Sequence, residues 1–147
     1  MKKSLIFSLL MFMGGIPAQA KMYHGTEDGK SYVINVDTMI NGSWGTNSIF
    51  LSKGTTYLQG NLEGTGFYVS FNSNSVVGSL PCGTLSLIFS SSYISGNVCG
   101  DSISQFGLDK NQINDFIADI VEGEITVHFP RVMRRVVFRF IEPILKR

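Results

Sequence analysis

A serine with two candidate bases is the constellation in this sequence closest to catalytic chemistry. Ser102 lies in the string Gly100-Asp101-Ser102-Ile103, and the chain contains two histidines, His24 and His128. A serine hydroxyl attacks a carbonyl only when a positioned base accepts its proton. Ser102 with His128 or His24 is therefore the candidate pair of a small serine hydrolase. Gly-Asp-Ser is also ordinary turn composition.

The same four residues resemble a known family motif. Gly100-Asp101-Ser102-Ile103 is similar to the nucleophile block of GDSL/SGNH-type hydrolases, and this resemblance implies an ester-cleaving nucleophile at Ser102. The family's Asp-x-x-His string, which would supply the acid and the base, is absent, because Ile125 stands three positions before His128. The sequence therefore favours a protein that is not an enzyme, with a serine hydrolase as the alternative.

Metal and cofactor chemistry find little support in the spacing of ligand residues. The sequence contains no C-x-x-C or H-x-x-x-H pattern, and no Gly-Lys-Ser/Thr string follows its glycines. Structural metal sites and phosphate-binding loops need such spacings. We expect neither a metal nor a cofactor.

Aromatic residues among small polar ones are candidates for ligand binding. Trp44 stands between Gly42-Ser43 and Gly45-Thr46, and Tyr68 lies on the polar side of an alternating run. Exposed rings beside Asn and Ser suit sugar stacking or protein recognition. Trp44 and Tyr68 are therefore the candidate ligand-binding residues, although for Trp44 the pattern favours a position that caps the core.

The first twenty residues have the pattern of a secretory signal peptide. Lys2 and Lys3 precede an apolar segment, and Ala18-Gln19-Ala20 ends it, so we expect cleavage after Ala20. The pattern is typical of bacteria and predicts a periplasmic or secreted product, 21–147. In such an oxidising compartment the two cysteines, Cys82 and Cys99, are expected to form a disulfide.

Charge is unevenly distributed along the exported part. Residues 21–130 carry four Lys/Arg and ten Asp/Glu, whereas residues 131–147 carry six Lys/Arg and one Glu. A basic end on an acidic body can be an interaction tail, or it can be a terminal strand with outward arginines. We expect no nucleic-acid partner, and membrane contact only if the end is an amphipathic helix.

Short alternating runs separated by Gly, Asn and Ser fill residues 21–106. Strands at spacings of roughly 8–12 residues predict an antiparallel barrel or sandwich, of which we favour the barrel. Residues 56–62 and 67–71 are predicted to form a hairpin, and Asn41-Gly42 is predicted to be a turn.

One amphipathic helix is predicted near residues 110–122. Asp109 and Gln112 have the spacing of a capping box, an apolar face that includes Phe116 and Ile120 follows, and Gly123 is a plausible end. Residues 125–129 alternate again and predict a strand. The basic end is ambiguous, but its β-branched and aromatic residues favour a strand over 132–140 that ends by Pro143.

Taken together, these features predict one exported, mainly β domain that is a non-catalytic binding or interaction protein. Loops held by a small disulfide-linked scaffold, those that bear Trp44 and the disulfide, would then bind a protein or glycan partner. The alternatives are the hydrolase built on Ser102 and a surface-assembly subunit that pairs through an exposed edge strand. The oligomeric state is left open by the sequence.

Overall fold

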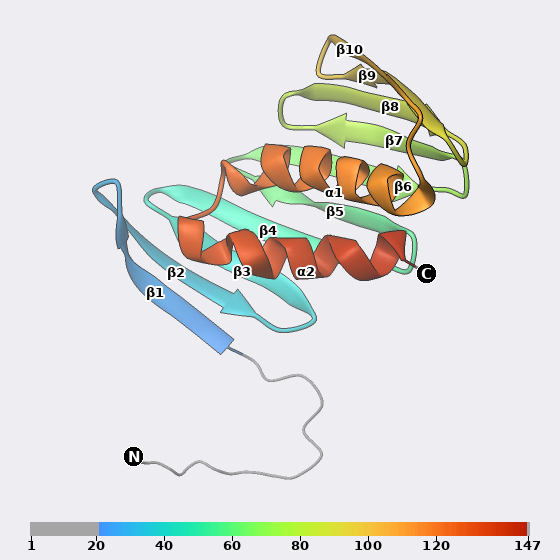
Figure 1. Cartoon of the computed structure of the whole chain (residues 1–147). Helices are drawn as coiled ribbons and strands as arrows, with labels where there is room; N and C mark the ends of the chain where they lie inside the picture. The colour runs from blue at the N-terminus through green and yellow to red at the C-terminus, as the bar shows by residue number, and fades with distance from the viewer. Residues whose placement is uncertain (1–20, 147) are drawn as a thin grey trace, which may run out of the picture.

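Ten antiparallel strands follow one another in the chain and lie side by side in the same order (Figure 1). The computed structural model describes residues 21–146, so the predicted signal peptide lies outside the described residues. The strands are β1 (Lys21–Glu27), β2 (Lys30–Val36), β3 (Met39–Trp44), β4 (Asn47–Lys53), β5 (Tyr57–Leu62), β6 (Thr65–Phe71), β7 (Ser75–Leu80), β8 (Gly83–Phe89), β9 (Tyr93–Val98) and β10 (Asp101–Phe106).

The mainly β class is confirmed, but the predicted barrel is wrong because the sheet does not close. Within residues 21–146, β1 and β10 each pair with one strand only, and they form opposite edges of the sheet. Two helices, α1 (Lys110–Thr126) and α2 (Arg134–Leu145), cover one face of the sheet (Figure 1). We call this face the inner face and the opposite one the outer face. The helices fill the space that side chains fill in a small closed barrel.

Alternation along the strands directs apolar side chains to the inner face. Leu58, Val69 and Leu87, for example, are fully buried there and belong to one continuous core with the helices. The predicted hairpin of residues 56–71 is confirmed as β5 and β6, with a two-residue turn at Glu63-Gly64. Both turn residues have positive φ, 55° and 83°, as a type I′ turn requires.

The turn predicted at Asn41-Gly42 is wrong, because Gly42 is the fourth residue of β3. A glycine recurs at the fourth position of β5, β7 and β9, eighteen residues apart each time: Gly60, Gly78 and Gly96. A Cβ at any of these four glycines would lie 2.0–2.1 Å from a carbonyl oxygen of the preceding strand. The sequence therefore contains an eighteen-residue hairpin repeat, and its glycines permit the close approach of paired strands.

The helix α1 begins as predicted but is longer than predicted. Asp109 accepts a hydrogen bond from the Gln112 amide at 2.8 Å, and the Gln112 side chain accepts one from the Asp109 amide at 2.9 Å, so the capping box is confirmed. The strand predicted over 125–129 is wrong, because α1 runs through Gly123 to Thr126. Ile125 extends a series of buried residues at every fourth position that begins at Ile113. A spacing of four residues occurs both on one face of a helix and on one face of a strand, so it did not distinguish the two.

The basic end is a helix and not the strand that we favoured. A short 3-10 turn, Arg131–Met133, leads into α2, which continues past Pro143 to Leu145. The buried residues of the turn and of α2 have helical spacing: Met133 in the turn and Val137, Phe140, Ile141 and Ile144 in α2. Because this apolar face completes the core, α2 is an integral element and not a detachable tail. No helix within residues 21–146 combines the length and apolar character needed to cross a bilayer.

Candidate binding surface on the outer face

The outer face of β5 to β9 carries almost no charge. From Gly64 to Gly100 the sequence contains no Asp, Glu, Lys, Arg or His. The register places small hydroxyl and amide side chains opposite one another on this face, as in the row Ser86, Asn97 and Ser102. Such a surface offers hydrogen bonds to a ligand but no ionic attraction.

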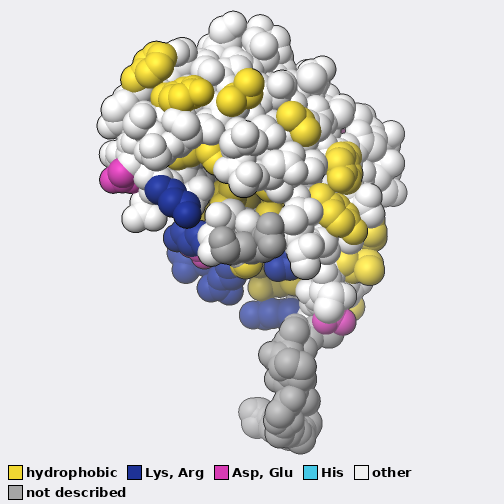
Figure 2. Space-filling model, turned by 90° about the vertical axis from the view of Figure 1, so that its right-hand side faces the viewer, with side chains coloured by type: hydrophobic (Ala, Val, Ile, Leu, Met, Phe, Trp, Pro, Cys, Tyr) yellow, Lys and Arg dark blue, Asp and Glu magenta, His cyan; other side chains and the backbone are white. Residues whose placement is uncertain are grey.

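Large apolar side chains form a diagonal line through this polar background. Tyr68 stands two residues before Ser70, which pairs with Val77, and Val77 pairs with Ser86, two residues before Ile88. We define the apolar stripe as this diagonal of outer-face residues together with Tyr57 of β5, which lies beside it against Tyr68: Phe50, Tyr57, Tyr68, Val77, Ile88, Tyr93 and Phe106. Figure 2 shows yellow side chains strung over a mostly white surface. Steps of ~4.8 Å between strands and ~3.3 Å along them give the stripe a length of about 40 Å.

Several members of the apolar stripe are well exposed. The exposed fraction is 45% for Tyr68, 54% for Ile88 and 74% for Phe106. Tyr68 stacks on Tyr57 with ring centroids 5.8 Å apart, and Phe106 stacks on Tyr93 at 6.1 Å. These pairs hold the rings in place, so a ligand meets preformed aromatic surfaces.

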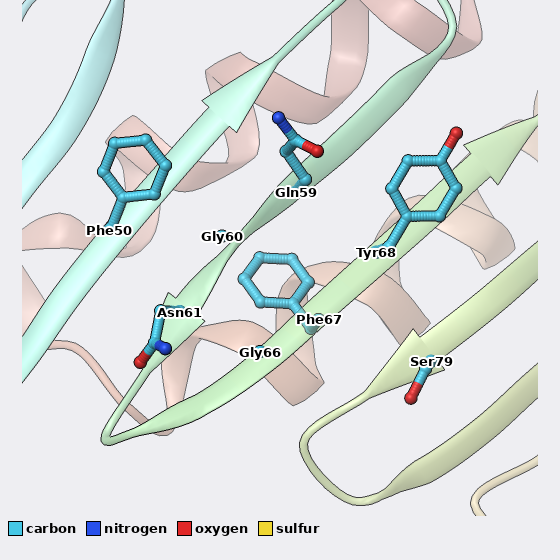
Figure 3. Close-up of a pocket in the computed structure, with 8 residues that line it drawn as sticks. All are labelled: Phe50, Gln59, Gly60, Asn61, Gly66, Phe67, Tyr68 and Ser79. Atoms are coloured by element: carbon cyan, nitrogen blue, oxygen red, sulfur yellow. The ribbon is translucent and has the colours of Figure 1, made fainter.

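A shallow hollow of about 460 Å³ lies near one end of the apolar stripe. Gly66 contributes no side chain, and the Phe67 ring lies beside Gly60 between β5 and β6 (Figure 3). Phe50 and Tyr68 stand on either side of the hollow, on β4 and β6 (Figure 3). Its polar lining is made of neutral groups only, the side chains of Gln59, Asn61 and Ser79. The hollow therefore combines aromatic rings with amide and hydroxyl groups.

The two predicted ligand-binding residues lie on different faces of the sheet. Tyr68 lines the hollow, whereas Trp44 is half-buried and packs against the inner core. The Trp44 indole N–H donates to the Glu27 carbonyl at 3.2 Å, and the Lys30 Nζ lies 5.0 Å from the centre of its ring. The structure therefore does not bring Trp44 and Tyr68 into one site.

The structure separates the candidate nucleophile from the candidate bases. Cys99-Gly100, with positive φ at both residues, is the turn between β9 and β10, so the Gly-Asp-Ser string is a turn followed by a strand. Ser102 Oγ donates to Asn97 Oδ1 at 3.4 Å. His128 Nδ1 lies 2.7 Å from Glu63 Oε2, and no hydrogen bond found in residues 21–146 joins Ser102 to either histidine.

The predicted disulfide is confirmed between Cys82 and Cys99. It joins the turn before β8 to the turn after β9, so it fixes one end of these neighbouring strands. Glu124 of α1 lies nearby, with a carboxylate oxygen within 4.8 Å of both sulfur atoms. In the oxidised state the two sulfurs are bonded to each other and are not thiolate ligands.

Comparison of the chain with protein-family models, curated proteins and solved structures found no match. The geometry of the outer face is therefore the basis on which a function can be inferred. Phe50, Gln59 and Asn61 line the hollow but were not predicted as site residues from the sequence. Two signals in the sequence point to this surface, the uncharged segment 64–100 and the eighteen-residue glycine repeat.

Proposed function

We propose that this chain is an exported, non-catalytic binding protein, and that its ligand is an extended, uncharged glycan held along the apolar stripe. The observation that carries the proposal is the line of exposed rings on a sheet face that has hydroxyl and amide groups but almost no charge. Aromatic faces pack on the apolar faces of sugar rings, while amides and hydroxyls bond to sugar hydroxyls. The predicted signal peptide and the disulfide support an exported location.

The chemistry of the surface favours a glycan over a protein partner. Protein interfaces are enriched in arginine as well as in aromatic residues. The hollow beside Tyr68 has aromatic rings but no arginine, and its polar groups are Gln59, Asn61 and Ser79. The stripe is also about 40 Å long and narrow, a shape that fits a linear chain.

Calorimetric titration with neutral and acidic oligosaccharides tests this proposal. The probes are maltohexaose, cellohexaose and chitohexaose, with the corresponding disaccharides and an oligogalacturonate as comparisons. We expect at least one neutral hexasaccharide to bind, more tightly than its disaccharide because it contacts more of the stripe. Binding of the acidic oligosaccharide alone, or equal affinity for disaccharide and hexasaccharide, would contradict the proposal.

Substitutions on the outer face connect the binding to the stripe. Tyr68→Ala should weaken hexasaccharide binding at least tenfold, which corresponds to about 1.4 kcal/mol, because it removes one exposed ring and its stacked pair. Val33→Ala is the matched control, because Val33 is also 45% exposed and lies on the same face at β2, outside the stripe. Equal losses from Tyr68→Ala and Val33→Ala would place the ligand elsewhere.

The open edges of the sheet favour a second candidate, a subunit that assembles by strand pairing. The outward edge of β10 is unpaired among residues 21–146, and β10 contains neither Lys nor Pro, which commonly block edge pairing. This candidate predicts an open-ended series of oligomers in sedimentation velocity. A single monomeric or dimeric species at all concentrations would exclude it.

A further inference from the structure

The side of the helix pair that faces away from the sheet carries two stripes of opposite charge. The acidic stripe on α1 is Asp115, Asp119 and Glu122, and the basic stripe on α2 and the turn before it is Arg131, Arg135 and Arg139. All are exposed except Glu122, which is half-buried. No other strand or helix of residues 21–146 lies over this side of the two helices (Figure 1).

The two stripes are largely unpaired within one chain. Arg134 Nε lies 3.8 Å from Glu122 Oε2, and this is the one ion pair between α1 and α2 within residues 21–146. Asp115, Asp119 and the arginines of the basic stripe form no ion pair among these residues. Charges that remain unpaired on one surface are available to an external partner.

The order of charges along the helices constrains what that partner can be. The helices are antiparallel (Figure 1), and the contact between Glu122 and Arg134 aligns them approximately. Asp119, three residues before Glu122, is therefore level with Val137, three residues after Arg134. At ~1.5 Å per residue, Asp119 is offset by about 3 Å from both Arg135 and Arg139.

We propose that two copies of this chain dock through their helix pairs, about a two-fold axis that runs parallel to the helices. Such an axis places α1 of each copy over α2 of the other, so that Asp119 of one copy faces the gap between Arg135 and Arg139 of its partner. A two-fold axis perpendicular to the helices, and parallel to the plane of the helix pair, would instead place α1 on α1 and bring like charges together. The surface is therefore self-complementary in one arrangement, as an isologous dimer requires.

The size of the helix pair predicts a weak dimer. The 17 residues of α1 span about 25 Å, and two adjacent helices are about 20 Å wide. The contact is thus about 500 Å² on each copy, or about 1,000 Å² in total, which is near the lower limit for specific interfaces. We expect micromolar affinity that depends strongly on salt, because exposed charges are screened within about 3 Å at 1 M ionic strength.

An anionic membrane is the competing partner for the arginines. Asp115 and Asp119 point to the same open side as Arg135 and Arg139, so a flat anionic surface would repel one helix while attracting the other. A second copy satisfies both stripes at once. This inference is independent of glycan binding, which uses the opposite face of the sheet.

Charge exchange between the stripes tests the proposal by sedimentation velocity. One variant carries Asp115→Arg and Asp119→Arg, and the other carries Arg135→Asp and Arg139→Asp. Each variant alone brings like charges together and should be monomeric at concentrations where the original chain is dimeric. An equimolar mixture should restore a dimer, because both contacts of the mixed pair then join opposite charges. Asp37→Arg, in the exposed turn between β2 and β3, is the control and should dimerise normally.

The original chain provides a test that depends on no variant. Its dissociation constant should rise at least tenfold between 0.1 M and 1 M NaCl. A chain that stays monomeric at 0.1 M salt and about 1 mM protein would overturn the proposal. It would also be overturned by a dimer that both exchanged variants retain, by folded variants whose mixture stays monomeric, or by binding to phosphatidylglycerol vesicles without dimer formation.

Discussion

Replacing Gly78 with alanine should strongly destabilise this protein, although Gly→Ala in a strand ordinarily stabilises by roughly 0.5–1 kcal/mol. A Cβ at Gly78 would lie 2.0 Å from the Tyr68 carbonyl oxygen and 2.8 Å from the Val69 Cα. The strands β6 and β7 must therefore separate by about 1 Å, which lengthens their hydrogen bonds beyond about 3.2 Å. Two weakened buried backbone bonds, at about 1–3 kcal/mol each, predict a net loss of about 2–5 kcal/mol.

Urea denaturation followed by circular dichroism measures this loss. For a slope of about 1.5 kcal/mol/M, a loss of 3 kcal/mol lowers the midpoint by about 2 M with little change in slope. Gly123→Ala is the matched control, because Gly123 is exposed on α1 and a Cβ there meets no atom within 4 Å. This control should stabilise by about 1 kcal/mol through helix propensity. A Gly78→Ala variant as stable as the original chain would refute the role of the glycine repeat in strand packing.

Four further predictions follow from the fold and the site. Deletion of residues 131–147 should abolish the cooperative melt, because α2 supplies part of the core; a melt near the original temperature would show that α2 is dispensable. Asp109→Ala should cost about 0.5–2 kcal/mol in chemical denaturation through loss of the capping box, whereas Asp115→Ala should cost under about 0.5 kcal/mol. Cys82→Ser should cost about 2–5 kcal/mol under oxidising conditions, and an unchanged urea midpoint would contradict this. A fluorophosphonate probe should leave Ser102 unlabelled in mass spectrometry, because its hydroxyl is bonded to Asn97 and not to a base.

The β-rich body could be predicted because strand periodicity and turn chemistry agree there. In β6, Phe67, Val69 and Phe71 alternate with polar residues, and Glu63-Gly64 supplies the positive φ of the preceding turn. The capping box of α1 was likewise visible, since it depends on two residues at fixed spacing. These features are local, so the sequence of a few residues determines them.

The end of the chain could not be predicted because its pattern fits two periods. Val121, Ile125 and Phe129 are four residues apart, a spacing shared by one helix face and by every second residue of a strand face. The strand preference of Val136 and Val137 is small compared with the burial of a complete helix face against the sheet. Phe116 and Ile120 lie on the apolar face that we expected to be buried against the sheet, but both are half-buried. This has the same origin, because the final position of α1 depends on α2.

The candidate site was only partly visible in the sequence. Tyr68 was identified from its polar neighbours, but the diagonal alignment of the stripe depends on the pairing of seven strands. A shift of one residue in any hairpin would move half of the stripe to the inner face. The turn predicted at Gly42 was wrong for a different reason. Close strand packing and tight turns both select glycine, so the residue alone does not distinguish them.

A nuclear magnetic resonance titration of an isotopically labelled chain of residues 21–147 tests whether the apolar stripe binds a neutral glycan. Maltohexaose, cellohexaose and chitohexaose are added in turn, and amide shifts are mapped on the sequence. At least one of them should shift amides of β5 to β8 around Tyr68 and Val77, while the amides of α1 and α2 are unaffected. Shifts confined to the helices or to the loop around Trp44, or no shift with any of the three, would contradict it.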